Sequence, residues 1–465
     1  MSLDTRRPDA APPRAGAPTR PAGAPTRPAG APARPADAPA QPSDGQLHPD
    51  GLPPGPHEGP HGAVNPNQRS NRRETRENTG GRRRRRPTRW TYWRRRIVAL
   101  FVVAGLWFAW SIGGALTAPG TDGVAERVAQ WARIHNFGWA ITAAEKVKYQ
   151  LHDKPATGGQ VSGIPTVDEA SAPKEPSAKP SIAAPPKVPT STAPGNLSPI
   201  AAGSVDGEGV WQPMYDVKGE HAAYATYLRP DAEHTSYLVG LVWMDPKLVS
   251  FRIHPGYNVP GGSGWAQENQ VPKDLRANVL ATFNSGFMMQ DARGGMWQQG
   301  KQVGALTRGA ASMVVNTDGT FDVRAWEGGE PGPGIDTVRQ NLVLMLDGGE
   351  VTQAVTNASY TAQWGATIGN AAFVWRSAVG VRNDGTVVFV AGPAMSIRSL
   401  AEVMKRAGVV RAMELDINPS WTNYITYTQD NGQTTPHMFP QGAQPNPWRY
   451  LTPSTRDFVG VYPRS

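Results

Sequence analysis

The sequence predicts an α+β domain over residues 206–465, with a mixed, largely antiparallel sheet and few helices. Short runs of β-branched and aromatic residues alternate there with Gly, Pro and Asp turn signals, which is typical of strands. Only one segment has the pattern of an amphipathic helix, and no strand–helix–strand unit repeats, so a parallel sheet is not expected. About 260 residues are enough to bury a substantial core in one domain.

Three strands and three hairpins are predicted within this domain. The strands cover residues 224–228, 237–243 and 249–253. Each hairpin turns at an Asp-Gly pair, a strong short-range signal for a tight β-turn. The hairpins cover residues 311–326, 341–351 and 378–391.

The predicted helix begins at a capping box, Ser399-x-x-Glu402, and ends at Gly408. Its buried stripe consists of Leu400, Val403, Met404 and Ala407. A buried strand is expected to follow over residues 410–416.

Residues 1–80 are expected to be a disordered tail rich in Pro, Ala and Arg. A seven-residue unit, GAPTRPA, recurs there with decay and has too few apolar side chains to offset the entropy of ordering. Residues 1–96 hold 19 Arg against 8 acidic residues, whereas the rest of the chain is close to neutral. The net charge of +9 therefore belongs to one end of the chain. This excludes a uniformly basic nucleic-acid-binding domain, and we expect no nucleic-acid partner.

A membrane anchor is predicted next. A basic flank, residues 81–96, precedes residues 97–118, a run of 22 residues without a charge. At 1.5 Å per residue this run spans the ~30 Å core of a bilayer, whereas the apolar part of a signal peptide, the competing interpretation, has only ~7–15 residues. The arginines before the run predict a single-pass protein of the cell membrane, in contact with membrane lipid. Its N-terminus would be cytoplasmic and its C-terminal domain extracellular.

Two segments connect the anchor to the domain. Residues 123–150 have the pattern of one or two amphipathic helices, broken near Gly138. Arg133, His135 and Glu145 are expected on the solvated faces of these helices. Residues 151–205 are rich in Pro, Ala, Ser and Thr, so a semi-extended linker is expected.

The absence of Cys and the spacing of the His residues exclude several kinds of site. The chain has no Cys, and therefore no disulfide, no thiolate metal site and no cysteine nucleophile. The histidines of the domain show no H-x-x-x-H or H-E-x-x-H spacing, so a zinc enzyme is not expected.

Two short motifs are candidates for ligand binding. Asn284 ends a predicted strand and could present its amide to a ligand, while Gly286 permits close approach of the backbone. On spacing alone an ordinary turn, in which Asn tolerates left-handed geometry, is the favoured interpretation. Arg376 begins a predicted strand, where its planar guanidinium would suit a phosphate or carboxylate.

Two acidic residues form the most unusual pattern. Glu414 and Asp416 lie two positions apart on the strand predicted over 410–416, so both point to one face. Buried carboxylates of this kind are costly unless they are solvated, paired or metal-bound. Glycoside hydrolysis uses such pairs. A calcium or magnesium site built from Glu414, Asp416 and Asn418 is the alternative, and no cofactor is certain.

These motifs, in this order, resemble the phosphodiester glycosidase family over roughly residues 236–461. The residues that carry the resemblance are N-S-G-F at 284–287, R-S-A-V-G at 376–380, N-D-G at 383–385, S-L-A-E at 399–402 and A-M-E-L-D at 412–416. After the Asp the family usually continues with G-G-G-S, whereas this chain has I-N-P-S-W at 417–421. Asn418 and Ser420 would then replace backbone amide donors with side-chain donors. The arrangement as a whole resembles a membrane-anchored, actinobacterial branch of the family.

The resemblance implies a hydrolase that cleaves a glycosyl phosphodiester at the anomeric carbon of the sugar. It implies Asp416 as a catalytic carboxylate, with Glu414 as its proton partner or support. It also implies Arg376 on the phosphate and Asn284 on a sugar hydroxyl. The alternative function is a non-catalytic surface module that binds an anionic cell-wall glycopolymer.

Overall fold

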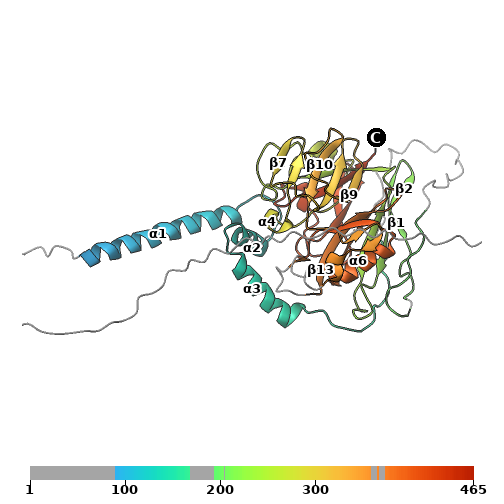
Figure 1. Ribbon diagram of the computed structural model, residues 1–465, viewed down its shortest axis with the longest axis horizontal. Coiled ribbons are helices and arrows are strands. Elements are labelled where there is room, and N and C mark those ends of the chain that lie inside the picture. The colour runs from blue at the N-terminus through green and yellow to red at the C-terminus, as the bar shows by residue number, and fades with distance from the viewer. Residues whose placement is uncertain (1–88, 168–192, 204, 358–363, 366–371, 465) are drawn as a thin grey trace, which may run out of the picture. The chain divides into compact units, whose positions relative to one another are not determined.

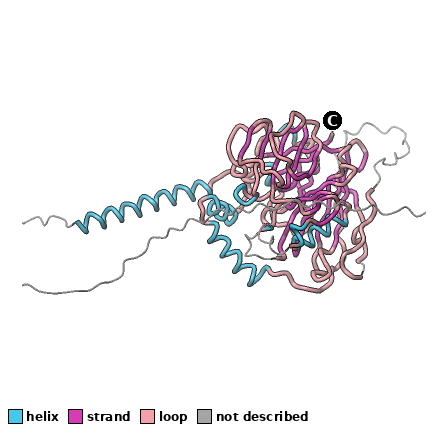
Figure 2. The backbone as a smooth tube through the Cα atoms, in the orientation of Figure 1, coloured by secondary structure: helices cyan, strands magenta, loops and turns pink. Residues whose placement is uncertain are grey.

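The C-terminal domain is built from three sheets, and the long helices come before it in the chain (Figures 1 and 2). The computed structural model describes residues 89–167, 193–203, 205–357, 364–365 and 372–464. The predicted tail, the first half of the basic flank and the middle of the linker, 168–192, lie outside the described residues.

The largest sheet has eight strands in the order β1-β2-β3-β14-β13-β15-β11-β12. These strands are β1 (Gln212–Val217), β2 (Glu220–Leu228), β3 (Val239–Met244), β11 (Leu346–Asp347), β12 (Glu350–Val351), β13 (Val374–Val381), β14 (Val387–Met395) and β15 (Arg411–Glu414). The hairpins predicted over 341–351 and 378–391 are confirmed as the antiparallel pairs β11–β12 and β13–β14. The strand predicted over 410–416 ends at Glu414, so Asp416 lies in the loop that follows.

Two five-stranded sheets complete the domain, in the orders β7-β6-β10-β8-β9 and β17-β16-β5-β18-β4. The first contains β6 (Met296–Gln298), β7 (Lys301–Val303), β8 (Ala311–Asn316), β9 (Phe321–Ala325) and β10 (Ile335–Gln340). The second contains β4 (Val249–His254), β5 (Ala281–Asn284), β16 (Tyr424–Asp430), β17 (Gln433–Phe439) and β18 (Phe458–Pro463). The hairpin predicted over 311–326 is the pair β8–β9. Neighbouring strands run antiparallel in the described chain, which confirms the predicted fold class.

Both faces of the eight-stranded sheet are buried. One face packs on the two smaller sheets through residues such as Phe389 and Met413, and the other packs on α6 (Ile397–Arg406) through Leu346 and Val390. A strand that is covered on both sides has no polar face, which explains why β14 is apolar along most of its length.

Helix α6 begins earlier than the predicted capping box. Ser396 is the N-cap, and its side-chain oxygen accepts a hydrogen bond from the backbone N–H of Ser399 at 3.0 Å. The predicted stripe is buried, and Gly408, at φ +75°, follows the helix in the left-handed region that favours glycine. The shorter helices are α4 (Met289–Ala292) and α5 (Gln353–Thr356), with 3-10 turns at Lys273–Leu275 and Arg449–Leu451.

Three helices precede the domain: α1 (Arg89–Leu116), α2 (Val124–Ile134) and α3 (Gly138–Lys148), followed by a π turn at Tyr149–Asp153. Within α1, Tyr92–Leu116 is long and apolar enough to cross a membrane. The end of α1 contacts α2, where the Trp131 indole N–H donates to Ser111 Oγ at 2.9 Å and the ring meets Phe108 edge-on. The break predicted near Gly138 separates α2 from α3.

The described ends of the predicted linker differ from a solvated spacer. Ile164 and Val167 pack against the core between the sheets, and Leu197 and Ile200 pack against the core beside α6. These four apolar side chains attach both ends of the segment to the domain because they bury surface that a free spacer would leave in water.

Candidate active site

The candidate site lies where the ends of three strands meet. Asp416 follows β15 and Asn284 ends β5, while Arg456 comes just before β18. Strands β5 and β18 are neighbours, and Asn284 pairs with Phe458, two residues after Arg456. Segments that are far apart in the sequence are therefore brought to one place by strand pairing.

Asp416 is held as an oriented carboxylate. Its Oδ1 accepts hydrogen bonds from the backbone N–H groups of Ile417 at 2.8 Å and Asn418 at 2.9 Å. Its Oδ2 accepts one from Arg456 Nη2 at 2.7 Å, and the two side chains are only 5% and 9% exposed. Two backbone N–H groups and one guanidinium therefore fix the orientation of this carboxylate.

Arg456 connects this carboxylate to the loop after β5. Its Nη2 also donates to the carbonyl of Gly286 at 2.9 Å, and its guanidinium lies 4.9 Å from the centre of the Trp421 ring. Among the described residues, its Nη1 and Nε have no hydrogen-bond acceptor, so these donors are available to a bound anion.

Asn284 supports the site from within the protein. Its side-chain Nδ2 donates to Ser377 Oγ at 3.0 Å, and Ser377 Oγ in turn donates to the Asp416 carbonyl at 3.2 Å. Its Oδ1 accepts the backbone N–H of Asn423 at 3.0 Å. The amide expected to bind a sugar hydroxyl therefore ties β5 to the loops that carry Asp416 and Asn423.

Gly286 is required by the close approach of Asn341. A Cβ at Gly286 would lie 2.8 Å from Asn341 Cγ, too close for real atoms. Asn341 accepts the Phe287 N–H at 3.1 Å and donates to the carbonyls of Glu414 and Leu415 at 2.8 and 3.0 Å. One buried side chain thus holds the loop after β5 against the end of β15.

Glu414 and Arg376 form a separate, buried ion pair at 2.5 Å, with side chains 0% and 4% exposed. Arg376 also donates to the carbonyls of Met395, Trp364 and Ala372, so its guanidinium is directed to the protein rather than to a ligand. Burial raises the pKa of Glu414 to about 7, although Arg376 lowers it, and repulsion from Asp416 adds a smaller upward effect.

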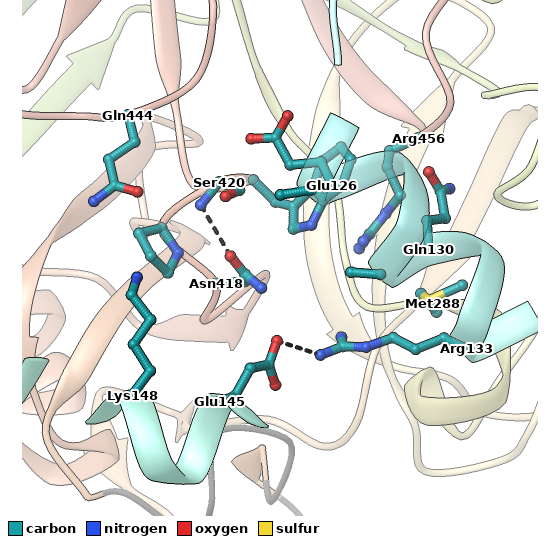
Figure 3. Close-up of a pocket in the computed structure, with 14 residues that line it drawn as sticks. Glu126, Gln130, Arg133, Glu145, Lys148, Met288, Asn418, Ser420, Gln444 and Arg456 are labelled. Carbon is teal, nitrogen blue, oxygen red and sulfur yellow. Dashed lines mark hydrogen bonds and ion pairs between the residues drawn. The ribbon is translucent and has the colours of Figure 1, made fainter. Parts of the chain in front are cut away.

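A pocket of about 200 Å³ is lined by Arg456, the partner of Asp416 (Figure 3). The loop after Asp416 contributes Asn418 and Ser420 to its wall, where the Ser420 N–H donates to Asn418 Oδ1 at 2.9 Å. Arg456 also reaches this wall. Of the site residues predicted from the sequence, Asn418 and Ser420 line this pocket, whereas Asp416, Glu414 and Arg376 do not.

Helices α2 and α3 supply the opposite wall, contrary to the expectation that their polar residues are solvated. Arg133 donates to Glu145 at 2.6 Å, and the two side chains are 14% and 22% exposed (Figure 3). Both line the pocket. Burial raises the pKa of Glu145 against the opposing effect of Arg133, and the negative charge of Asp416 raises it further.

A third carboxyl group, that of Asp291 on α4, belongs to the same electrostatic cluster. Burial raises its pKa, Arg133 and Arg456 lower it, and Asp416 raises it. The charges of two pocket-lining arginines, Arg133 and Arg456, therefore both act on Asp291.

The cation site built from Glu414, Asp416 and Asn418 does not fit this geometry. Glu414 binds Arg376, both Asp416 oxygens accept N–H groups, and Asn418 Oδ1 accepts the Ser420 N–H. Within the part of the chain that the structure describes, no group of three or more His, Asp or Glu residues is placed to hold a metal ion.

Several residues of the site are not predicted from the sequence. Arg456 and Asp457 precede a strand without a recognisable motif, and Asn341 follows a strand of mixed character. The one available signal is the charged pair Arg456-Asp457 immediately before an apolar strand. Asp457 forms a fully buried ion pair with Arg339 at 2.6 Å, and Arg339 donates to the Phe287 carbonyl at 2.6 Å.

Part of the domain that carries this site is similar to a known family of hydrolases. Residues 277–445 match the family model described as phosphodiester glycosidase. The matched segment contains Asn284, Gly286 and Asp416, whereas Arg456 and helices α2 and α3 lie outside it.

Solved structures include distant relatives. The zebrafish N-acetylglucosamine-1-phosphodiester alpha-N-acetylglucosaminidase catalytic domain, auto-inhibited by its pro-peptide, is 18% identical, and the match covers 52% of this chain and 82% of that one with a TM-score of 0.35. A hypothetical protein from Synechocystis is 14% identical, and the match covers 54% of this chain and 64% of that one with a TM-score of 0.31. No curated protein matches the chain.

Proposed function

We propose that this protein is a membrane-anchored hydrolase that cleaves glycosyl phosphodiesters outside the cell, with a role in the cell envelope. The observation that supports this most strongly is the Asp416–Arg456 pair: a carboxylate and a guanidinium lie 2.7 Å apart, and the guanidinium side chain lines a pocket together with other polar donors. A glycosyl phosphodiester needs both, because positive charge develops on the sugar and negative charge on the departing phosphate.

In the proposed reaction, the bond between the anomeric carbon and the phosphate oxygen breaks. The electron pair leaves with the phosphate, and a water molecule supplies hydroxide to the sugar and a proton to the solvent or to the phosphate monoester. Asp416 stabilises the positive anomeric centre or attacks it, and Arg456 binds the phosphate through Nη1 and Nε while Nη2 holds Asp416. A phosphate monoester is a stable anion, so protonation of the leaving group contributes little.

Asn418 and Ser420 take the place of the glycine loop. The Asn418 N–H and the Ser420 N–H are both engaged within the loop, with Asp416 Oδ1 and Asn418 Oδ1 respectively. The Asn418 Nδ2 and the Ser420 hydroxyl at the pocket wall are the groups that we propose contact the sugar or the phosphate. In this proposal Glu414 and Arg376 act as a buried support for β15 rather than on the substrate.

The contacts of α1 favour an uncleaved anchor over a signal peptide. Arg127 of α2 donates to carbonyls at the end of α1 and just beyond it, among them Leu116 at 3.2 Å and Gly120 at 2.8 Å. Trp131 packs on Phe108 and donates to Ser111. Removal of α1 would leave a buried tryptophan and an arginine without these partners.

The test is an assay of the full chain in detergent against a glycosyl phosphate diester and a UDP-sugar, with the Asp416→Asn variant as control. Release of sugar by the natural chain, lost in the variant, is the expected result. Binding of the diester without turnover would overturn the hydrolase and favour the alternative, a module that binds an anionic cell-wall glycopolymer.

A further inference from the structure

A second cavity lies on the membrane side of the active-site pocket. Its volume is about 280 Å³, and its walls include Ser111, Gly114 and Ala115 of α1 together with Arg127, Gln130 and Trp131 of α2. We call it the membrane-side cavity. Gln130 also lines the active-site pocket, so the two spaces meet at this side chain.

Gln130 is the buried polar group at this junction. The residue is 5% exposed, and its Nε2 has no hydrogen-bond partner among the described residues. A buried amide donor is normally paired, because leaving it unpaired is costly. An oxygen-rich ligand at the junction would supply the missing acceptor.

The membrane-side cavity begins inside the apolar span. Ser111 lies five residues before the end of α1 at Leu116, which corresponds to about 8 Å along the helix axis. This depth falls within the outer half of a bilayer core that is ~30 Å thick. Gly114, Ala115 and Ala118 have no long side chains, so this wall of the cavity is open and its side chains are apolar, while the Arg127 guanidinium is held by the Leu116 and Gly120 carbonyls.

The domain is attached directly to this end of α1. Asp122, six residues after the helix, forms an ion pair with Arg449 at 2.9 Å and accepts the Thr455 hydroxyl at 2.6 Å. The Tyr257 hydroxyl donates to the Pro119 carbonyl at 2.8 Å. These contacts hold the residues next to Arg456 close to the bilayer surface when α1 spans the membrane.

We infer that the substrate is a lipid-linked glycosyl phosphodiester that enters from the outer leaflet, an inference that rests on the proposed function. Its apolar tail lies along α1 at Gly114, in the membrane-side cavity. Its phosphodiester accepts hydrogen bonds from Gln130 and Arg456. Its sugar occupies the active-site pocket beside Asn418 and Ser420.

The order of these groups matches the chemistry of such a molecule. From α1 inward, the molecule would first meet the apolar side chains of the membrane-side cavity. The unpaired Gln130 amide and the Arg456 guanidinium come next, and the polar active-site pocket comes last. A soluble glycosyl phosphodiester would use the last two regions and would have no use for the first. The membrane-side cavity therefore specifies the lipid part of the substrate.

The experiment compares two substrates with the same glycosyl phosphate, using the full chain reconstituted in phosphatidylglycerol vesicles. In one substrate the phosphate is esterified to a long-chain isoprenoid alcohol held in the bilayer, and in the other to methanol. The variant Gly114→Leu fills the membrane-side cavity. Gly113→Leu is the matched control, because a Cβ at either position meets no atom within 4 Å and only Gly114 lines the cavity.

We expect the natural chain to cleave the lipid-linked substrate with the higher kcat/KM. Gly114→Leu should lower kcat/KM for that substrate about tenfold or more and leave the methyl ester unchanged, while Gly113→Leu should affect neither. Equal effects of Gly114→Leu on both substrates, or no effect on either, would overturn the inference. Cleavage of the methyl ester alone would overturn it too but leave the proposed function intact, whereas cleavage that survives Asp416→Asn, or cleavage of neither substrate, would overturn the proposed function with it.

Discussion

Arg456 donates two hydrogen bonds from one nitrogen, to the Asp416 carboxylate at 2.7 Å and to the Gly286 carbonyl at 2.9 Å. This guanidinium therefore connects the loop after β5 directly to the loop after β15. Both loops belong to the segment that matches the family model, and Arg456 lies beyond it. The arginine that pairs with Asp416 is therefore Arg456, whereas the sequence motif suggests Arg376 as the arginine of the site.

Asp416→Asn should abolish hydrolysis and leave the fold intact. The amide keeps the volume but loses the charge that stabilises the anomeric centre, so we expect kcat to fall more than about a hundredfold. Sugar release measures the loss, and the unfolding temperature checks the fold. Turnover close to that of the natural chain would exclude Asp416 as the catalytic carboxylate.

Arg456→Lys should weaken both functions of the guanidinium. Lysine keeps the charge but cannot bind a carboxylate, a carbonyl and a phosphate at the same time, so we expect kcat/KM to fall about ten- to a hundredfold. The matched control is Arg406→Lys, at a partly exposed i,i+4 pair with Glu402. Equal activity of the two variants would show that Arg456 has no role in the reaction.

Arg133 and Glu145 should have opposite effects on substrate binding. In the structure Glu145 forms an ion pair with Arg133, and both side chains line the pocket. The Arg133 guanidinium is therefore less available to a substrate anion. Glu145→Gln should therefore lower KM for a phosphodiester, and Arg133→Gln should raise it, each by about three- to tenfold. Steady-state kinetics measures both, with Glu402→Gln as the control. A change of KM in the same direction in both variants would contradict this role.

Protonation of Glu414 predicts how stability depends on pH. Burial raises its pKa in the folded protein to about 7 from the ordinary 4.5. A carboxyl whose pKa is raised by folding stabilises the fold below pH 4.5, and this contribution is lost as the pH rises through 7. Other groups being equal, the unfolding free energy should fall over this range by a few kcal/mol at most.

Thermal unfolding of the natural chain and of Glu414→Gln between pH 5 and 8 measures this effect. The variant should show a flatter dependence, because glutamine does not titrate. Glu402→Gln, on an exposed face of α6, should keep the dependence of the natural chain. Identical slopes in the natural chain and in Glu414→Gln would rule out a raised pKa at Glu414.

Gly286→Ala should destabilise the domain. The new Cβ would lie 2.8 Å from Asn341 Cγ and 2.9 Å from its Oδ1, and Asn341 is held by three hydrogen bonds. Overpacking of this kind costs about 1–3 kcal/mol. Gly334→Ala, where a Cβ meets no atom within 4 Å, is the control. Chemical denaturation of both variants should separate them, and equal stability would refute the steric argument.

Local patterns in the sequence predict much of the fold. The Asp-Gly turns locate hairpins such as β8–β9 and β13–β14, because a tight turn is decided by its own residues. The start of α6 is displaced by three residues because Ser396 and Ser399 both suit an N-cap. The prediction that Arg133 lies on a solvated helix face is wrong for a different reason. The sequence pattern of an amphipathic helix is the same whether its polar face contacts water or lines a pocket.

The sequence by itself determines the antiparallel α+β class and the apolar span in α1, because both depend on periodicity, and a contiguous motif singles out Glu414 and Asp416 as candidate catalytic residues. Only the tertiary structure decides that Arg376 pairs with Glu414, that Arg456 pairs with Asp416, and that Gln130 joins two cavities. These relationships span 38, 40 and more residues, and strand pairing and helix packing create them. The charge of an arginine is known from the sequence, whereas the carboxylate with which it pairs depends on the fold.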